Sequence, residues 1–92
     1  MKEIYAVSAV SKDMRILSKP FGIFTTEGNA TMAVMKNYDF IHEHYYEYAV
    51  IEKYYLNRLQ PLAIEIQWYD LINEIECDKP ECFDRIINFA IG

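Results

Sequence analysis

The alternation of hydrophobic and polar positions predicts a β-sheet whose central strand lies within residues 45–55. Five of the eight tyrosines fall in this stretch, and its middle is β-branched or small. Apolar side chains occupy both alternations, so neither face of the strand is consistently polar. We therefore expect a central strand that is covered on both sides in its middle. One face would carry Tyr46, Tyr48, Val50 and Tyr54, and the other would carry Tyr45, Ala49, Ile51 and Tyr55.

Two more strands are predicted before this stretch. Ile4 to Val10 is apolar on both alternations, which is typical of a buried strand. Met14 to Thr25 predicts a second strand that is bent at Pro20, because proline cannot donate a ladder hydrogen bond. A hairpin through the polar residues 11–13 is the simplest link between the two.

The last third of the chain predicts shorter elements after a loop over residues 56–62. Ile64, Ile66 and Trp68 alternate with polar neighbours and indicate a half-buried strand, with Trp68 in the core. A short returning strand is expected at Ile75–Cys77 and a last strand at Ile86–Ile91. Between them, Asp78-Lys79-Pro80-Glu81 resembles the entry to a single helical turn.

One main helix is predicted to begin at Thr25-Thr26-Glu27, where a hydroxyl can cap the first N–H groups. Apolar and small residues then recur at helical spacing up to Ile41. We expect the helix to break near Asp39–Glu43, because tyrosine, valine and isoleucine enrichment from Tyr45 favours a strand. One long helix reaching Tyr55 is the alternative.

These elements predict a single α+β domain over residues 1–92. Its sheet, mixed or antiparallel, would have five to six strands in the order β-β-α-β-β-β, with one main helix packed on one face. The hydrophobic fraction of 52% is consistent with a packed fold. A domain this small leaves much apolar surface to cover, so we also expect a homodimer.

The net charge of −5 argues against direct binding to nucleic acid. Met1-Lys2-Glu3 leads straight into a strand pattern, and no apolar run approaches transmembrane length. We therefore expect a cytoplasmic protein without membrane contact, in which Cys77 and Cys82 are free thiols.

Catalytic and metal-binding patterns are weak. His42 and His44, with Cys77 and Cys82, are the residue types of a zinc site, but their spacing fits one poorly. With glycine only at positions 22, 28 and 92, no phosphate-binding loop is present. We expect a protein that is not an enzyme and that uses no cofactor or metal.

The acidic residues suggest a protein-binding face. Residues 61–92 contain seven acidic residues against Lys79 and Arg85. A second acidic run, Asp39, Glu43, Glu47 and Glu52, would extend this face, and it has no basic residue within it before Lys53. Our first hypothesis is a module that docks on a host protein with a basic surface. Its contact residues would be Asp39, Glu43, Glu47, Tyr54, Tyr55, Tyr69, Glu74, Glu76, Asp78, Glu81 and Asp84.

Two alternatives come from other classes. One is a small-ligand binder that sequesters a nucleotide-like signal, with an aromatic ring on the base and cations on the phosphate. Its residues would be Lys12, Arg15, Lys19, Arg58 and Tyr69. The other is an accessory domain with a purely structural role.

Several short segments resemble a group of small uncharacterised single-domain proteins carried by bacterial and phage genomes. The similarity spans most of the chain and involves strand cores, a helix cap and turns. It implies an inhibitor of a host defence system that acts in the host cytoplasm, and it assigns no functional residue. The segments are Tyr5-Ala6-Val7-Ser8, Arg15-Ile16, Gly22-Ile23-Phe24-Thr25-Thr26, Asn29-Ala30, Tyr46-Glu47-Tyr48-Ala49-Val50-Ile51-Glu52, Gln67-Trp68-Tyr69, Lys79-Pro80 and Ile87-Asn88-Phe89.

Overall fold

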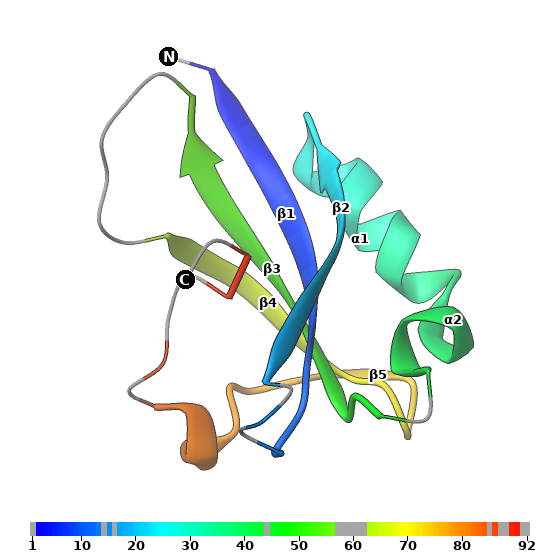
Figure 1. Cartoon of the computed structure of the whole chain (residues 1–92). Helices are drawn as coiled ribbons and strands as arrows, with labels where there is room; N and C mark the ends of the chain where they lie inside the picture. Colours follow the sequence, from blue (N-terminus) through cyan, green and yellow to red (C-terminus); the bar gives the residue numbers. More distant parts are fainter. Residues whose placement is uncertain are drawn as a thin grey trace.

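Five antiparallel strands form one sheet in the order β2-β1-β3-β4-β5 (Figure 1). The structure, a computed structural model, describes residues 2–13, 15, 17–43, 45–56, 63–84, 86 and 89–90. The predicted α+β class and the helix on one face are confirmed. The strands are β1 (Glu3–Val10), β2 (Ser18–Phe24), β3 (Tyr48–Tyr55), β4 (Ile64–Asp70) and β5 (Ile75–Cys77).

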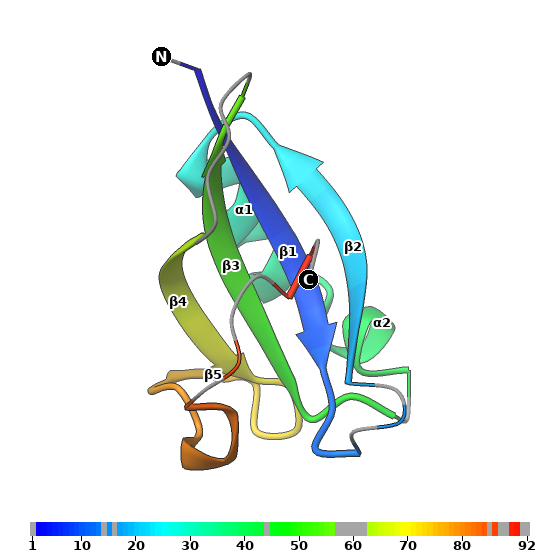
Figure 2. The ribbon, with the colours of Figure 1, turned by 60° about the vertical axis from the view of Figure 1, so that its left-hand side comes forward.

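The helices α1 (Glu27–Met35) and α2 (Tyr38–His42) lie on one face of the sheet. In Figure 2, the described C-terminal residues, 89 and 90, lie on the opposite face. They follow the 3₁₀ turn η1 (Glu81–Phe83), which occupies the place predicted for a single helical turn. No helix in the described part of the chain is long and apolar enough to cross a membrane.

The helix begins where the sequence predicted, because Thr26 caps it. The Asn29 N–H donates to Thr26 Oγ1 at 3.2 Å, which satisfies one of the free N–H groups of the first turn. The single predicted helix is nevertheless divided. α1 ends at Met35, and Asn37 turns back so that its side-chain amide donates to the Ala33 carbonyl at 2.7 Å.

The boundary between α2 and β3 differs from the predicted one. The helical part ends near the predicted break, with Glu43 in the left-handed region at φ 50°. The strand, however, begins at Tyr48 and not at Tyr45. The N–H groups of Tyr45 and Tyr46 both donate to the His42 carbonyl at 2.9 Å. These N–H groups therefore cap the C-terminal end of α2 and do not take part in the hydrogen bonds of the sheet.

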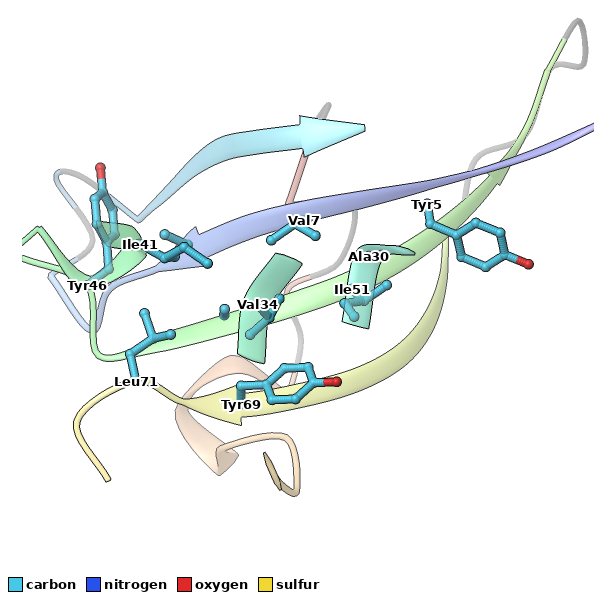
Figure 3. Packing of buried hydrophobic residues seen from close by; sticks show 11 residues of the cluster. Tyr5, Val7, Ala30, Val34, Ile41, Tyr46, Ile51, Tyr69 and Leu71 are labelled. Atoms are coloured by element: carbon cyan, nitrogen blue, oxygen red, sulfur yellow. The ribbon is translucent and has the colours of Figure 1, made fainter. Parts of the chain in front are cut away.

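β3 is the central strand of the sheet and is covered on both faces, as predicted. Ala49 and Ile51 belong to the core beneath the helices, whereas Val50 belongs to the core on the opposite face. Figure 3 shows the helix-side core, where Ala30 and Val34 of α1 lie over Ile51 and Tyr69.

A β-bulge in β2 accounts for the bend that Pro20 predicted. Val7 pairs with Gly22 and Ser8 pairs with Pro20, which leaves Phe21 without a partner on β1. Proline is tolerated here because β2 is an edge strand. The glycine at position 22 also matters, since a Cβ there would lie 3.0 Å from the Phe24 ring.

A second bulge, in β4, overturns the predicted alternation of that strand. Ile51 pairs with Gln67 and Glu52 pairs with Glu65, so Ile66 is the extra residue. Beyond the bulge, the side chains change faces. Ile66 therefore packs against the helix-side core while Trp68 lies in the opposite one, and the two do not share a face.

The core opposite the helices is aromatic. The Trp68 and Phe83 rings are stacked with centroids 5.6 Å apart, and Phe89 meets Trp68 edge-on at 5.3 Å. The predicted last strand over residues 86–91 is not formed by its described residues, because Phe89 and Ala90 lie in a turn. They pack over the sheet face instead of joining its edge, so the sheet has five strands and not six. Other residues of that segment, and the loop predicted at 56–62 apart from Leu56, lie outside the described residues.

We expect Trp68→Ala to unfold most of the protein at room temperature. Truncating a buried tryptophan costs about 3–5 kcal/mol, which is comparable to the whole stability of a small domain. Phe40→Ala is the matched control, since Phe40 is 66% exposed and its loss should cost about 1 kcal/mol or less. Urea unfolding followed by circular dichroism measures both. Equal losses in the two variants would contradict the assignment of Trp68 to the core.

Candidate functional site

The turn between β4 and β5 presents the first part of the acidic segment. Its geometry is held by Asp70, whose carboxylate accepts the N–H groups of Ile72 and Asn73 at 3.0 Å each. The Asn73 side chain adds a third hydrogen bond at 2.8 Å. Hydrogen bonds from Asn73 therefore hold the pKa of Asp70 below its usual range. This network fixes the direction in which the residues after the turn leave β4.

Five exposed carboxylates follow this turn along β5 and η1. We call them the acidic surface: Glu74, Glu76, Asp78, Glu81 and Asp84. None of them forms an ion pair with another described residue. The charges of Glu74 and Glu76 reach α2, where they add to burial in raising the pKa of Tyr38. Glu76 thus lies on the helix side of β5, opposite Tyr69, whereas η1 packs against the other face of the sheet.

Two isoleucines stand exposed within the same stretch. Ile72 in the turn is 61% exposed, and Ile75 at the start of β5 is 55% exposed. Large apolar side chains that are exposed beside unpaired charges in the chain can serve as an interface anchor with a polar rim. Both isoleucines were absent from the predicted contact residues, which were chosen by charge and by aromatic character.

The other predicted acidic run does not form a continuous face. Glu43 is ion-paired with Lys19 at 3.3 Å, and the Glu47 carboxylate accepts the Lys12 N–H at 2.8 Å. Glu52 is not at the surface at all, since its side chain is buried. Of the four residues in this run, only Asp39 is exposed and has no ion pair with another described residue. Burial therefore excludes Glu52 from an exposed binding face, whereas the binding roles of Asp39, Glu43 and Glu47 stay predictions.

Two of the three predicted tyrosine anchors are buried. Tyr69 is 1% exposed and lies under α1, and Tyr54 is 7% exposed on the opposite face. Tyr69 directly follows Trp68 in β4, so the two side chains point to opposite faces, and both faces are covered by a core at this point. Tyr55 is half-buried, and the exposed ring of this stretch is that of Tyr45.

The residues of the alternative ligand site are not brought together around a ring. Arg15 is ion-paired with Asp13 at 3.0 Å, and Lys19 with Glu43. The Lys12 ammonium lies 5.7 Å from the centroid of the Tyr48 ring. Tyr69 is inaccessible, and Arg58 lies outside the described residues. The described members of this set therefore form no pocket for a nucleotide.

The cysteines and histidines do not gather either. Within the described residues, no three histidine, cysteine or acidic side chains lie close enough to hold a metal ion, and His44 lies outside them. His42 uses Nδ1 to contact the Tyr46 carbonyl. Burial, together with the charges of Asp70 and Asp78, raises the pKa of the Cys77 thiol. An elevated pKa disfavours the nucleophilic thiolate.

Glu52 is the buried charged group that the sequence interpretation missed. Its carboxylate accepts the N–H groups of Phe89 and Ala90 at 3.1 and 3.2 Å and the Tyr54 hydroxyl at 3.2 Å. Burial raises the pKa of Glu52, and the three hydrogen bonds act in the opposite direction. A usable signal existed, because Glu52 directly follows the buried run Ala49-Val50-Ile51 in a strand predicted to be covered on both faces.

A shallow apolar groove on the helix side is lined in part by α2. It has a volume of about 180 Å³ and lies between β2 and the two helices. Phe21 and Phe40, whose rings meet edge-on at 5.5 Å, form part of its wall. Its lining is apolar apart from Asn37, so it offers no acid–base group for chemistry.

Comparison with known proteins assigns no relative. No known protein family, curated protein or solved structure matches the chain.

We expect Tyr54 to contribute to alkaline unfolding. Burial raises the pKa of Tyr54 above its ordinary value of 10.0, and the Glu52 charge adds to the rise. The folded protein therefore keeps this proton while the unfolded chain releases it near pH 10. The contribution of Tyr54 to stability is complete below that pH and is lost as the pH rises further.

Tyr54→Phe tests this dependence by urea unfolding between about pH 8 and 12. At pH 8 the variant should be less stable by about 1–2 kcal/mol, since one hydrogen bond to a carboxylate is lost. The difference from the wild type should then narrow at alkaline pH. A residual slope is expected from Tyr5, Tyr38 and Tyr69, whose pKa values are also raised. Parallel curves for the two proteins would contradict the prediction.

Proposed function

We propose that the chain is a non-enzymatic protein-binding module that docks on a basic surface of a partner protein. The observation that carries this proposal is the acidic surface, five exposed carboxylates without ion pairs in the described part of the chain. The other acidic side chains near it are committed elsewhere: Asp70 holds a turn and Glu65 pairs with Lys79 at 2.9 Å. The acidic surface thus carries unneutralised charge in a protein with net charge −5.

The apolar and charged groups would act at different stages of binding. Uncompensated carboxylates attract a basic partner over about 10 Å at 0.1 M salt and raise the rate of encounter. Ile72 and Ile75 would then supply the contact from which water is excluded, because charge pairs at a rim add little affinity. Two rigid features support such docking, the Asp70-capped turn and the pairing of β5 with β4.

The edge position of β5 gives the binding site a second property. β5 pairs with β4 on one side and ends the sheet on the other. An extended segment of a partner can add a strand at such an edge. Carboxylates flanking a sheet edge also discourage pairing with other acidic chains, including copies of itself. The surface therefore favours a basic segment over a like-charged one.

The identity of the partner stays a prediction from resemblance. The similarity to small phage-borne proteins supports a partner within a host defence system, bound in the host cytoplasm, and an inhibitory outcome. Sequestration of a nucleotide-like ligand finds less support, because Tyr69 is buried and Arg15 and Lys19 are ion-paired. The predicted homodimer is not part of the proposal.

The binding experiment uses a defined probe, a fluorescently labelled ten-residue peptide that alternates lysine with valine. Fluorescence anisotropy should show binding to the wild type that weakens as NaCl rises. The variant Glu74→Gln, Glu76→Gln, Asp78→Asn should bind at least about tenfold more weakly, because three charges near the probe are removed. Its stability should change little, since these side chains are exposed and unpaired.

A control variant makes the same change in net charge away from β5. Ile23→Lys, Thr25→Lys, Asn29→Lys alters exposed residues in β2, just after it and in the first turn of α1, and should retain most of the affinity. Equal weakening in both variants would show that only net charge attracts the peptide, and the proposed surface would be wrong. Unchanged binding together with self-association of the amide variant would indicate that the carboxylates only protect the β5 edge.

A further inference from the structure

The described C-terminal residues Ile86, Phe89 and Ala90 cover the sheet face opposite the helices (Figure 2). Phe89 and Ala90 make no backbone hydrogen bond with a described strand. Sheet side chains bind their backbone instead. Phe89 and Ala90 donate to the two oxygens of Glu52, and Ser18 Oγ donates to the Phe89 carbonyl at 2.9 Å.

Glu52 and this pair of residues depend on each other. The Glu52 side chain is 0% exposed, and a carboxylate without water needs hydrogen-bond donors to replace its hydration. Two of its three donors are the N–H groups of Phe89 and Ala90. In turn, those N–H groups would be buried without an acceptor if Glu52 were absent, which is costly.

Most of the remaining contacts involve side chains, and the backbone bond from the Ile86 N–H to the Phe83 carbonyl at 2.9 Å is local to η1 and does not join the sheet. The Phe89 ring lies against Trp68 and Phe83, with centroids at 5.3 and 6.2 Å. The Lys79 ammonium lies 6.0 Å from the Phe89 centroid and donates to the Ile86 carbonyl at 2.9 Å. By contrast, β1 and β3 are joined by a continuous ladder along their whole length. The contacts of Phe89 and Ala90 can therefore open locally while the ladder between β1 and β3 stays intact.

A buried hydroxyl lies on the same sheet face. Ser8 is opposite Val50, a member of the core under Phe89, and its Oγ has no hydrogen-bond partner among the described residues. Hydrophobic cores rarely leave such a group unsatisfied. The face therefore carries two polar groups, Ser8 and Glu52, that water would solvate if the C-terminal residues moved away.

We propose that Phe89–Ala90 is a strap that is released from the sheet without unfolding of the sheet, and that Glu52 holds it closed through their two N–H groups. Release exposes Glu52 and the edge of Trp68 and withdraws Phe89 from the Phe83 ring. The strap is independent of the proposed binding function.

Native-state hydrogen exchange of the full chain, followed by NMR at constant pD, tests the strap. The Phe89 and Ala90 amides should exchange at least about tenfold faster than those of Val50 and Ile51, with a weaker dependence on denaturant, because they open locally. Glu52→Gln keeps the side-chain volume but offers one acceptor oxygen and adds N–H donors. This substitution should accelerate hydrogen exchange of the Phe89 and Ala90 amides by roughly a further tenfold relative to exchange of the Val50 and Ile51 amides.

Two further variants make the result decisive. Glu43→Gln is the matched control, since Glu43 pairs with Lys19 and lies away from the strap, and it should leave the exchange ratio unchanged. Ser18→Ala removes the bond to the Phe89 carbonyl and should accelerate the strap amides by a smaller factor. It serves as the test if Glu52→Gln fails to fold. Exchange of Phe89 and Ala90 in step with Val50 and Ile51, in the wild type or in these variants, would overturn the proposal.

Discussion

Burial of β3 on both faces is the constraint on which the rest of the fold depends. Ala49 and Ile51 need a cover on one side and Val50 and Glu52 on the other. The chain meets the first need with α1, whose Ala30 and Val34 are small enough to approach the sheet closely. It meets the second with η1 and the C-terminal residues, which contribute aromatic rings where a helix would contribute a continuous apolar stripe.

The two covers differ in how firmly they are attached. α1 has a capped start and a compact apolar contact, so its position follows from local hydrogen bonding and packing together. The opposite cover depends on a buried carboxylate that must lose its hydration to accept two backbone N–H groups. Interactions of that kind are specific in geometry but add little net stability. The fold therefore combines a helix face held by a cap and apolar packing with an opposite face held by aromatic packing and by the polar contacts of Glu52.

The position of the acidic surface follows from this arrangement. β5 forms the edge of the sheet, and η1 follows it in the chain. Their carboxylates are exposed on a scaffold that is held by the pairing of β5 with β4 and by the stacked rings of Trp68 and Phe83. Charge of one sign is left unpaired there, whereas Glu43, Glu65 and Asp13 have cationic partners elsewhere on the molecule. An unpaired set beside exposed isoleucines is the physical basis for proposing a basic protein partner and no small ligand.

The sequence by itself determined the elements whose signals are local. The hydroxyl of Thr26 predicted the helix start, the apolar run at residues 49–51 predicted a doubly covered strand, and residues 75–77 were correctly predicted as a short returning strand. The exposed positions of Glu74, Glu76 and Asp78 also followed from local charge. Only tertiary structure decided the rest. The bulge at Ile66 shifts the alternation of β4, so that Ile66 and Trp68 face different cores, and alternation in a single strand carries no information about the register of its partner. Glu52 has the same charge as its exposed neighbours in the sequence. It is buried because the C-terminal residues, distant in sequence, bring it two N–H donors.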